Sequence, residues 1–121
     1  RSNFNAQPVE QAFQAGPWLV SDGEAQSRFR NANVVTRRTA VGVDKKGRVI
    51  LAATDALLGG ISLPELADYL ARPEGEGGFE LWRAINCDGG TSTQMLLRHP
   101  RESLTIRSTV RVPAYLGVFA P

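Results

Sequence analysis

Residues 84–93, Ala84-Ile85-Asn86-Cys87-Asp88-Gly89-Gly90-Thr91-Ser92-Thr93, join an apolar run to a polar turn. The apolar part, residues 84–87, predicts a buried strand that ends at an acid, two glycines and three hydroxyl residues. Adjacent glycines let the backbone adopt positive φ angles and approach a ligand closely, and N–H groups in such a turn can hold an anion. The stretch predicts either a ligand-binding loop at the end of a strand or a plain Asp-Gly turn between two strands.

The segments before this stretch predict how it is placed in a sheet. A strand over residues 49–54, a helix over 62–71 and the strand over 84–87 follow one another, which predicts a β-α-β unit with parallel strands. Ligands of open sheets bind beyond the carboxyl ends of the strands. Asp55 follows one such end and Asp88 the other, so we expect both carboxylates to face one site.

The other expected elements are shorter. Pro8 and Gly16 frame a short helix, in the order that helix ends favour, and residues 24–37 read as a surface loop. Strands are predicted at residues 18–20, 38–43, 94–97 and 110–119, with a turn at 44–47. The last two strands are expected to complete the sheet. The expected fold is α+β: a mixed β-sheet packed with a few short helices and containing the β-α-β unit.

Composition limits the class of protein. A chain of 121 residues, 42% of them hydrophobic, is long enough for one domain with a core. A net charge of +2 without clustered Lys and Arg excludes a nucleic-acid-binding footprint. The single cysteine excludes an internal disulfide, and no apolar run reaches the length of a membrane span. No nucleotide-binding glycine fingerprint or zinc-type Cys/His cluster occurs, so no cofactor or metal is expected.

Four motifs stand in order along the chain. They are Ala-Gly-Pro-Trp-Leu-Val at residues 15–20, Arg-Thr-Ala-Val-Gly-Val-Asp at 38–44, Asp55 with Gly-Ile-Ser-Leu-Pro-Glu-Leu-Ala at 60–67, and Ile-Asn-Cys-Asp-Gly-Gly-Thr-Ser at 85–92. Together they resemble the phosphodiester glycosidase family, whose signature for the last motif is (I/L)-N-L-D-G-G-G-S. Thr91 stands where that signature has its third glycine, and Cys87 where it has leucine.

The resemblance implies a hydrolase that cleaves the bond between the anomeric carbon of a sugar and a phosphodiester. Such cleavage uses carboxylates as acid, base or nucleophile; Asp88 is the first candidate and Asp55 the second. Arg38, which matches the motif arginine, is expected to contact the phosphate unless it only pairs with Asp44 or Glu24 at the surface. The remaining expected substrate-binding residues are Asn86, Gly89, Gly90, Thr91, Ser92 and Arg111. Cys87 is expected to be a small core residue and His99 to lie in a turn.

The resemblance leaves several alternatives open. The family domain is longer than this chain, and its N-terminal half has no match here, so residues 1–121 are expected to be one family-like domain without that half. The sequence is then a fragment, or a second chain carries the missing half. A non-catalytic module that binds phosphorylated glycans of a bacterial envelope is the competing function. No signal peptide opens the chain, as is also the case in the mature form of a secreted protein. A secreted or periplasmic location is expected, and a cytoplasmic one is the alternative.

Overall fold

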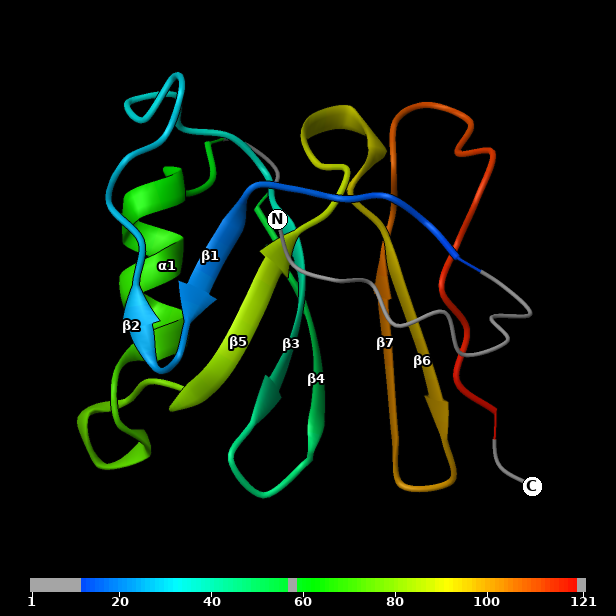
Figure 1. The fold of residues 1–121 in the computed structure, drawn as a ribbon. Helices are drawn as coiled ribbons and strands as arrows, with labels where there is room; N and C mark the ends of the chain where they lie inside the picture. Colours follow the sequence, from blue (N-terminus) through cyan, green and yellow to red (C-terminus); the bar gives the residue numbers. More distant parts are fainter. Residues whose placement is uncertain (1–11, 57–58, 120–121) are drawn as a thin grey trace.

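The computed structural model describes residues 12–56 and 59–119, which form two β-sheets and one α-helix (Figure 1). In chain order the elements are β1 (Trp18–Ser21), β2 (Glu24–Ala25), β3 (Thr39–Asp44), β4 (Val49–Ala53), α1 (Leu63–Ala71), β5 (Leu81–Asn86), β6 (Met95–His99) and β7 (Glu102–Ile106). Two short 3₁₀ turns, Glu74–Glu76 and Gly90–Ser92, precede and follow β5. In the part of the chain that the structure describes, no helix is long and apolar enough to cross a membrane.

The larger sheet has the strand order β2-β1-β5-β3-β4, and its neighbouring strands all pair antiparallel. Because β4 and β5 are both antiparallel to β3, they run in the same direction with β3 between them. α1 links these two strands along the chain, which confirms the predicted β-α-β unit and the α+β class. The helix packs on β1, β2 and β5. Because β4 and β5 run in the same direction, their carboxyl ends lie at one end of the sheet (Figure 1).

α1 begins where its sequence signals predict. The Ser62 side chain accepts a hydrogen bond from the Glu65 N–H, and the Glu65 carboxylate accepts one from the Ser62 N–H at 2.9 Å. This reciprocal capping box satisfies two N–H groups that a helix start leaves free. The buried face of the helix consists of Leu63, Leu66, Ala67 and Leu70. It packs against a core formed by the strands at Leu19, Val20, Ala40, Leu81 and Ala84.

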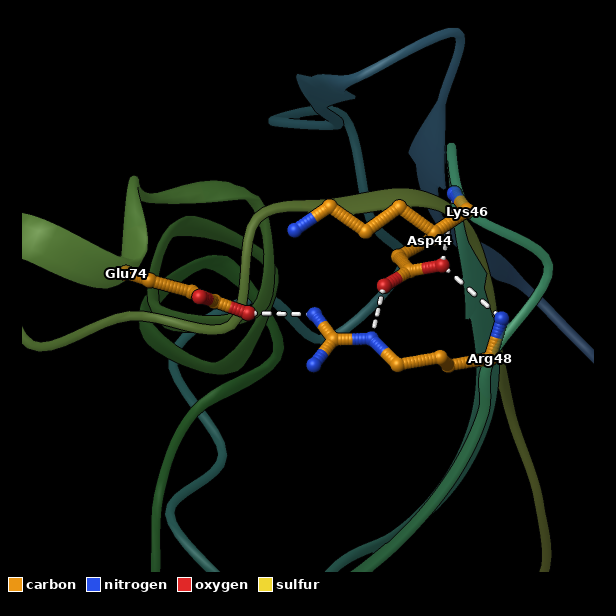
Figure 2. A network of polar contacts seen from close by, with 4 residues as sticks. All are labelled: Asp44, Lys46, Arg48 and Glu74. Carbon is orange, nitrogen blue, oxygen red and sulfur yellow. Dashed lines mark hydrogen bonds and ion pairs between the residues drawn. The ribbon is translucent and has the colours of Figure 1, made fainter.

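The turn between β3 and β4 is fixed by Asp44, which is buried (Figure 2). One carboxylate oxygen accepts hydrogen bonds from the N–H groups of Lys46 at 2.8 Å and Arg48 at 2.9 Å. The other accepts from the Arg48 guanidinium, which also contacts Glu74. Burial acts to raise the pKa of Asp44, but the hydrogen bonds from Arg48 and Lys46 outweigh it and lower that pKa. Asp44, the last residue of the second motif, therefore closes a hairpin turn.

The C-terminal third differs from its sequence prediction. Residues 110–119 contain no strand, so the prediction of a strand there was wrong. The segment has the apolar composition of a strand, but Pro113 lacks the N–H that a central strand needs. β6 pairs instead with β7, a strand that the sequence reasoning missed, and these two form a separate hairpin that does not complete the larger sheet. The predicted helix over 8–16 falls largely outside the described residues, and residues 12–16 are not helical.

Candidate functional site

The motif loop, residues 87–93, leaves the carboxyl end of β5 and folds back against the residues that lead into β3. The Cys87 N–H donates to the Thr39 carbonyl at 2.8 Å, and the Gly90 N–H donates to the Arg37 carbonyl at 2.7 Å. The 3₁₀ turn Gly90–Ser92 then closes the loop, with the Thr93 N–H bonded to the Gly90 carbonyl at 3.3 Å. The loop is thus tied at two points to one neighbouring segment.

The two glycines of the loop serve different purposes. Gly89 has extended backbone, with φ at −137°, but a Cβ there would lie 2.9 Å from the Arg37 carbonyl oxygen. Gly90 has φ at +59°, a conformation that side chains with a Cβ rarely adopt. Gly89 therefore allows a close approach of two backbones, and only Gly90 supplies the positive φ that the sequence predicted. Because the Gly90 N–H donates to the Arg37 carbonyl, it is not free for the anion that the sequence predicted at this turn.

Asp55 and Asp88 both lie at the end of the sheet that the β-α-β order predicts. Asp55 follows β4 and Asp88 follows β5, and both side chains are exposed. One strand, β3, separates the two parent strands, so their backbones are two strand spacings apart, about 10 Å. The topology brings the two carboxylates to the same edge, and their assignment as catalytic groups remains a prediction.

Arg38 is half-buried and its guanidinium is engaged by the protein backbone. Its Nε donates to the Ile61 carbonyl at 3.1 Å and its Nη2 to the Val34 carbonyl at 2.6 Å. Burial lowers the pKa of Arg38. The surface pairing that sequence reasoning kept as its alternative is not formed, since Asp44 pairs with Arg48. Arg38 therefore holds residues 34–38 against the segment that precedes α1.

Arg37 is the arginine that the structure brings to the motif loop, and sequence reasoning missed it. Its Nη2 donates to the carbonyls of Thr93 at 3.0 Å and Arg107 at 2.9 Å. Its own carbonyl accepts the hydrogen bond from Gly90 described above. Side chains of adjacent extended residues point in opposite directions, so Arg37 had to point away from Arg38. That alternation was the available signal.

Buried polar atoms without a hydrogen-bond partner gather around this loop. Among the residues that the structure describes, they are Arg37 Nε, Thr39 Oγ1, Asn86 Oδ1 and Thr93 Oγ1. All of them lie in the two segments that form the site, residues 37–39 and 86–93. Buried polar atoms normally have partners, and exceptions mark strain, catalysis or a bound water or ion. This concentration supports the loop as the functional region.

The other predicted residues occupy varied positions. The Asn86 side-chain N–H donates to the Gly16 carbonyl at 3.1 Å, so in this structure it anchors the segment before β1. Thr91 is exposed and Ser92 half-buried, and the Thr91 carbonyl accepts the Thr109 N–H at 2.9 Å. That bond brings the chain near Arg111, which is exposed, to the loop.

Cys87 and His99 have the surroundings expected of residues outside the chemistry. Cys87 is half-buried, and burial raises the pKa of its thiol, which disfavours a thiolate nucleophile. His99 ends β6 at the hairpin turn, where its Nδ1 accepts the Arg101 N–H at 3.2 Å. In residues 12–56 and 59–119, no group of His, Cys, Asp and Glu side chains could hold a metal ion.

Comparison with known proteins agrees with the motifs. The sequence profile of the phosphodiester glycosidase family matches residues 1–119. The chain belongs to the phosphodiester glycosidase family. Its bovine (Bos taurus) relative, named N-acetylglucosamine-1-phosphodiester alpha-N-acetylglucosaminidase, is 38% identical over 108 residues, which cover 74% of this chain and 19% of the relative. The human protein of the same name is 36% identical over 108 residues, covering 74% of this chain and 20% of the relative.

A solved structure has a similar fold over part of the chain. The crystal structure of a hypothetical protein from Synechocystis superposes with a TM-score of 0.51 at 30% sequence identity. The superposition covers 66% of this chain and 16% of that protein. The chain thus spans about a fifth of the curated relatives that it matches. The family is established for this sequence, whereas the relatives carry much further polypeptide.

Proposed function

We propose that this chain contributes the motif loop to a phosphodiester glycosidase that hydrolyses the bond between a sugar's anomeric carbon and a phosphodiester. The observation that carries the proposal is the loop itself. Asp88 is exposed at the carboxyl end of β5, on a turn tied to Arg37 and Thr39 by backbone hydrogen bonds. A carboxylate on a rigidly anchored loop can be held in one position relative to a substrate.

In the proposed reaction water supplies an oxygen to the anomeric carbon, and the bond from that carbon to the phosphate oxygen breaks. The phosphate leaves as a monoester of the second alcohol. Asp88 serves as general acid/base or as nucleophile, and Asp55 at the same edge is the second carboxylate of the pair that such reactions use. A phosphate is a better leaving group than an alcohol, so recognition of its charge carries more of the catalysis than proton donation.

Phosphate recognition is proposed for two arginines, Arg38 and Arg111. Arg38 uses Nε and Nη2 for backbone carbonyls, so its contact with a phosphate would come from the rest of its guanidinium. Arg111 is exposed and lies two residues after Thr109, which is bonded to the loop. The hydroxyls of Thr91 and Ser92 complete the set of donors for phosphate or sugar.

The test is hydrolysis of a synthetic sugar-1-phosphodiester by the 121-residue chain, measured as release of the phosphomonoester. A phosphate-free glycoside of the same sugar is the matched control, and we expect much slower turnover of it. Equal rates on both compounds would show that the phosphate is not recognised. The Arg38→Lys variant, which keeps the charge but loses the planar fork, should lower kcat/KM more for the phosphodiester than for the glycoside; equal losses on both would assign Arg38 a structural role alone.

A second function, binding without turnover, is supported by Thr91, which stands where the family signature has its third glycine. The relatives' names describe an activity of whole proteins, of which this chain matches 19% and 20%. A binding module would take up the same phosphodiester without releasing product. We propose that a second polypeptide, carrying the rest of the family domain, is the partner that would restore turnover. We also propose that both act in a secreted or periplasmic location.

A further inference from the structure

The outer strand of the larger sheet, β4, presents an unused hydrogen-bonding edge. The Asp44 N–H donates to the Arg48 carbonyl at 3.1 Å, and the Thr54 N–H donates to the Arg38 carbonyl at 2.9 Å. In this register the backbone N–H and C=O groups that point toward β3 are those of residues 48, 50, 52 and 54. Along an antiparallel strand, the backbone groups of successive residues point alternately toward and away from the partner strand. The N–H and C=O groups of Val49, Leu51 and Ala53 therefore point away from β3. Within the described residues β4 is the last strand of the sheet order.

The surface beside this edge is mainly apolar, although Arg38 and Thr54 also line it. A groove of about 310 Å³ follows the strand and is lined on one face by Leu51 and Ala53. On the helix face it is lined by Ala52 with the α1 leucines Leu66 and Leu70 and the neighbouring aromatic residues. Met95, the first residue of β6, also lines it. A strand placed there would bury the side chains that it turns toward α1.

β4 also lacks the features that protect outer strands from pairing. Proteins block such edges with proline, lysine, bulges or inward-pointing charges. The sequence of β4 is Val-Ile-Leu-Ala-Ala, and its register with β3 is regular along its whole length. Val49 is 66% exposed and Leu51 38% exposed. The strand is therefore suited to pairing with another.

Residues 114–119, Ala-Tyr-Leu-Gly-Val-Phe, have the complementary character. They form an uncharged apolar run with no strand or helix, and Tyr115, Val118 and Phe119 are 83%, 75% and 83% exposed. Such a run supplies apolar side chains that match the apolar residues lining the groove. In Figure 1 this segment (red) runs beside β6, on the far side of the β6–β7 hairpin from β4.

We propose that residues 114–119 of a second copy of this chain add to β4 as an extra strand and fill the groove between β4 and Met95. The outward groups of Val49, Leu51 and Ala53 would bond to the added backbone, and the exposed aromatic side chains would enter the apolar lining. Two copies exchanging these segments form a closed two-fold pair, in which each copy donates one segment and accepts one. Strand addition of this kind obtains affinity from the main chain and specificity from the side-chain pockets.

Two variants test the exchange by complementation. Leu51→Lys damages the accepting edge and leaves the donated segment intact, whereas Leu116→Asp damages the donated segment and leaves the edge intact. In analytical ultracentrifugation we expect the wild type at twice the 13.1 kDa of one chain and each variant alone as a monomer. Mixing the two variants should restore a dimer, because one intact segment then meets one intact edge. A mixture that stays monomeric overturns the proposal.

Leu96→Lys is the matched control, because Leu96 is a 62% exposed leucine on β6, outside the groove. It should remain dimeric, and dissociation by this variant would place the contact on the hairpin instead. Should a groove variant not fold, hydrogen exchange of the wild-type chain decides. We expect the amides of Val49, Leu51 and Ala53 to be protected at high concentration and to exchange rapidly on dilution. A monomer with these amides unprotected, or one with them protected by its own segment at every dilution, contradicts the exchange.

Discussion

The two ends of β3 differ in how the protein uses its polar groups. At the Asp44 end, one buried carboxylate accepts hydrogen bonds from Lys46 and Arg48, and Arg48 continues to Glu74 (Figure 2). At the other end, residues 37–39 and 86–93 hold all the buried polar side-chain atoms without a hydrogen-bond partner that are found in the described residues. The first end is satisfied by the fold itself. The second retains hydrogen-bonding capacity, which is typical of a functional site.

The largest expected effect is the loss of kcat in Asp88→Asn, which distinguishes the motif loop from the Asp44 turn. Asp88→Asn keeps the shape of the side chain but removes its charge and its titrating proton. If Asp88 takes part in the reaction, kcat should fall by a factor of about 100 or more, the scale of lost acid/base catalysis. The melting temperature should stay unchanged, because an exposed turn aspartate tolerates asparagine.

Asp44→Asn is the control for that variant and should behave in the opposite way. Its melting temperature should fall while kcat per folded molecule changes little. Both quantities are measured on one preparation of each variant. An active and stable Asp88→Asn would remove Asp88 from the mechanism and leave Asp55 as the acid to examine.

The next effect compares glycines at the two ends. Gly90 in the loop and Gly47 in the Asp44 turn have φ angles of +59° and +80°, and a Cβ at Gly47 meets nothing within 4 Å. Valine at either position should cost roughly 1–2 kcal/mol of stability through left-handed backbone strain. Only Gly90→Val should also abolish hydrolysis, because only that glycine shapes the loop. Comparable activity losses in both variants would mean that the loop has no special role.

A smaller effect is expected at Arg37. Lysine keeps the charge but cannot donate from one planar group to the carbonyls of both Thr93 and Arg107. Losing one such hydrogen bond costs about 1 kcal/mol, so Arg37→Lys should lower the melting temperature by a few degrees and reduce kcat/KM several-fold. Arg83→Lys, at an exposed pair with Asp22, should change neither in the same assays. An unchanged Arg37→Lys would show that the loop holds its shape without this clamp.

The smallest effect is a dependence of stability on pH. The pKa of Asp44 is lower in the folded chain than its ordinary value of about 4. A lowered folded pKa stabilises the protein fully above the unfolded pKa and loses that contribution as pH falls through the folded one. Urea unfolding between pH 7 and pH 3 should show stability declining below about pH 4. Asp44→Asn should make the decline in stability less steep. If the decline is equally steep in this variant, other carboxylates cause it.

Local signals in the sequence predicted the elements that depend on neighbouring residues. The capping box of Ser62 and Glu65 fixed the start of α1, and the turn at residues 44–47 fixed the β3–β4 hairpin. The position of the motif loop at the end of a strand was also predicted, because an apolar run changes abruptly to Asp-Gly-Gly.

Long-range features were beyond the sequence patterns. β7 reads Glu-Ser-Leu-Thr-Ile, too polar to stand out, and is a strand because β6 lies beside it. Residues 110–119 were predicted to be a strand from composition alone, but a strand also needs a partner. The sequence did not show which of Arg37 and Arg38 contacts the motif loop. Their orientation depends on how residues 34–38 pack against Ile61, a residue far along the chain.

The place of β5 between β1 and β3 has a consequence for how the chain folds. The hairpins β1–β2 and β3–β4 require only contacts between nearby residues, so they can form early. The sheet becomes continuous only when β5 inserts between strands that precede it in the chain, and residues 87–93 take their shape after that step. A nascent chain halted before residue 81 would present two unjoined apolar hairpins to chaperones, and the candidate site would be among the last parts of the molecule to be assembled.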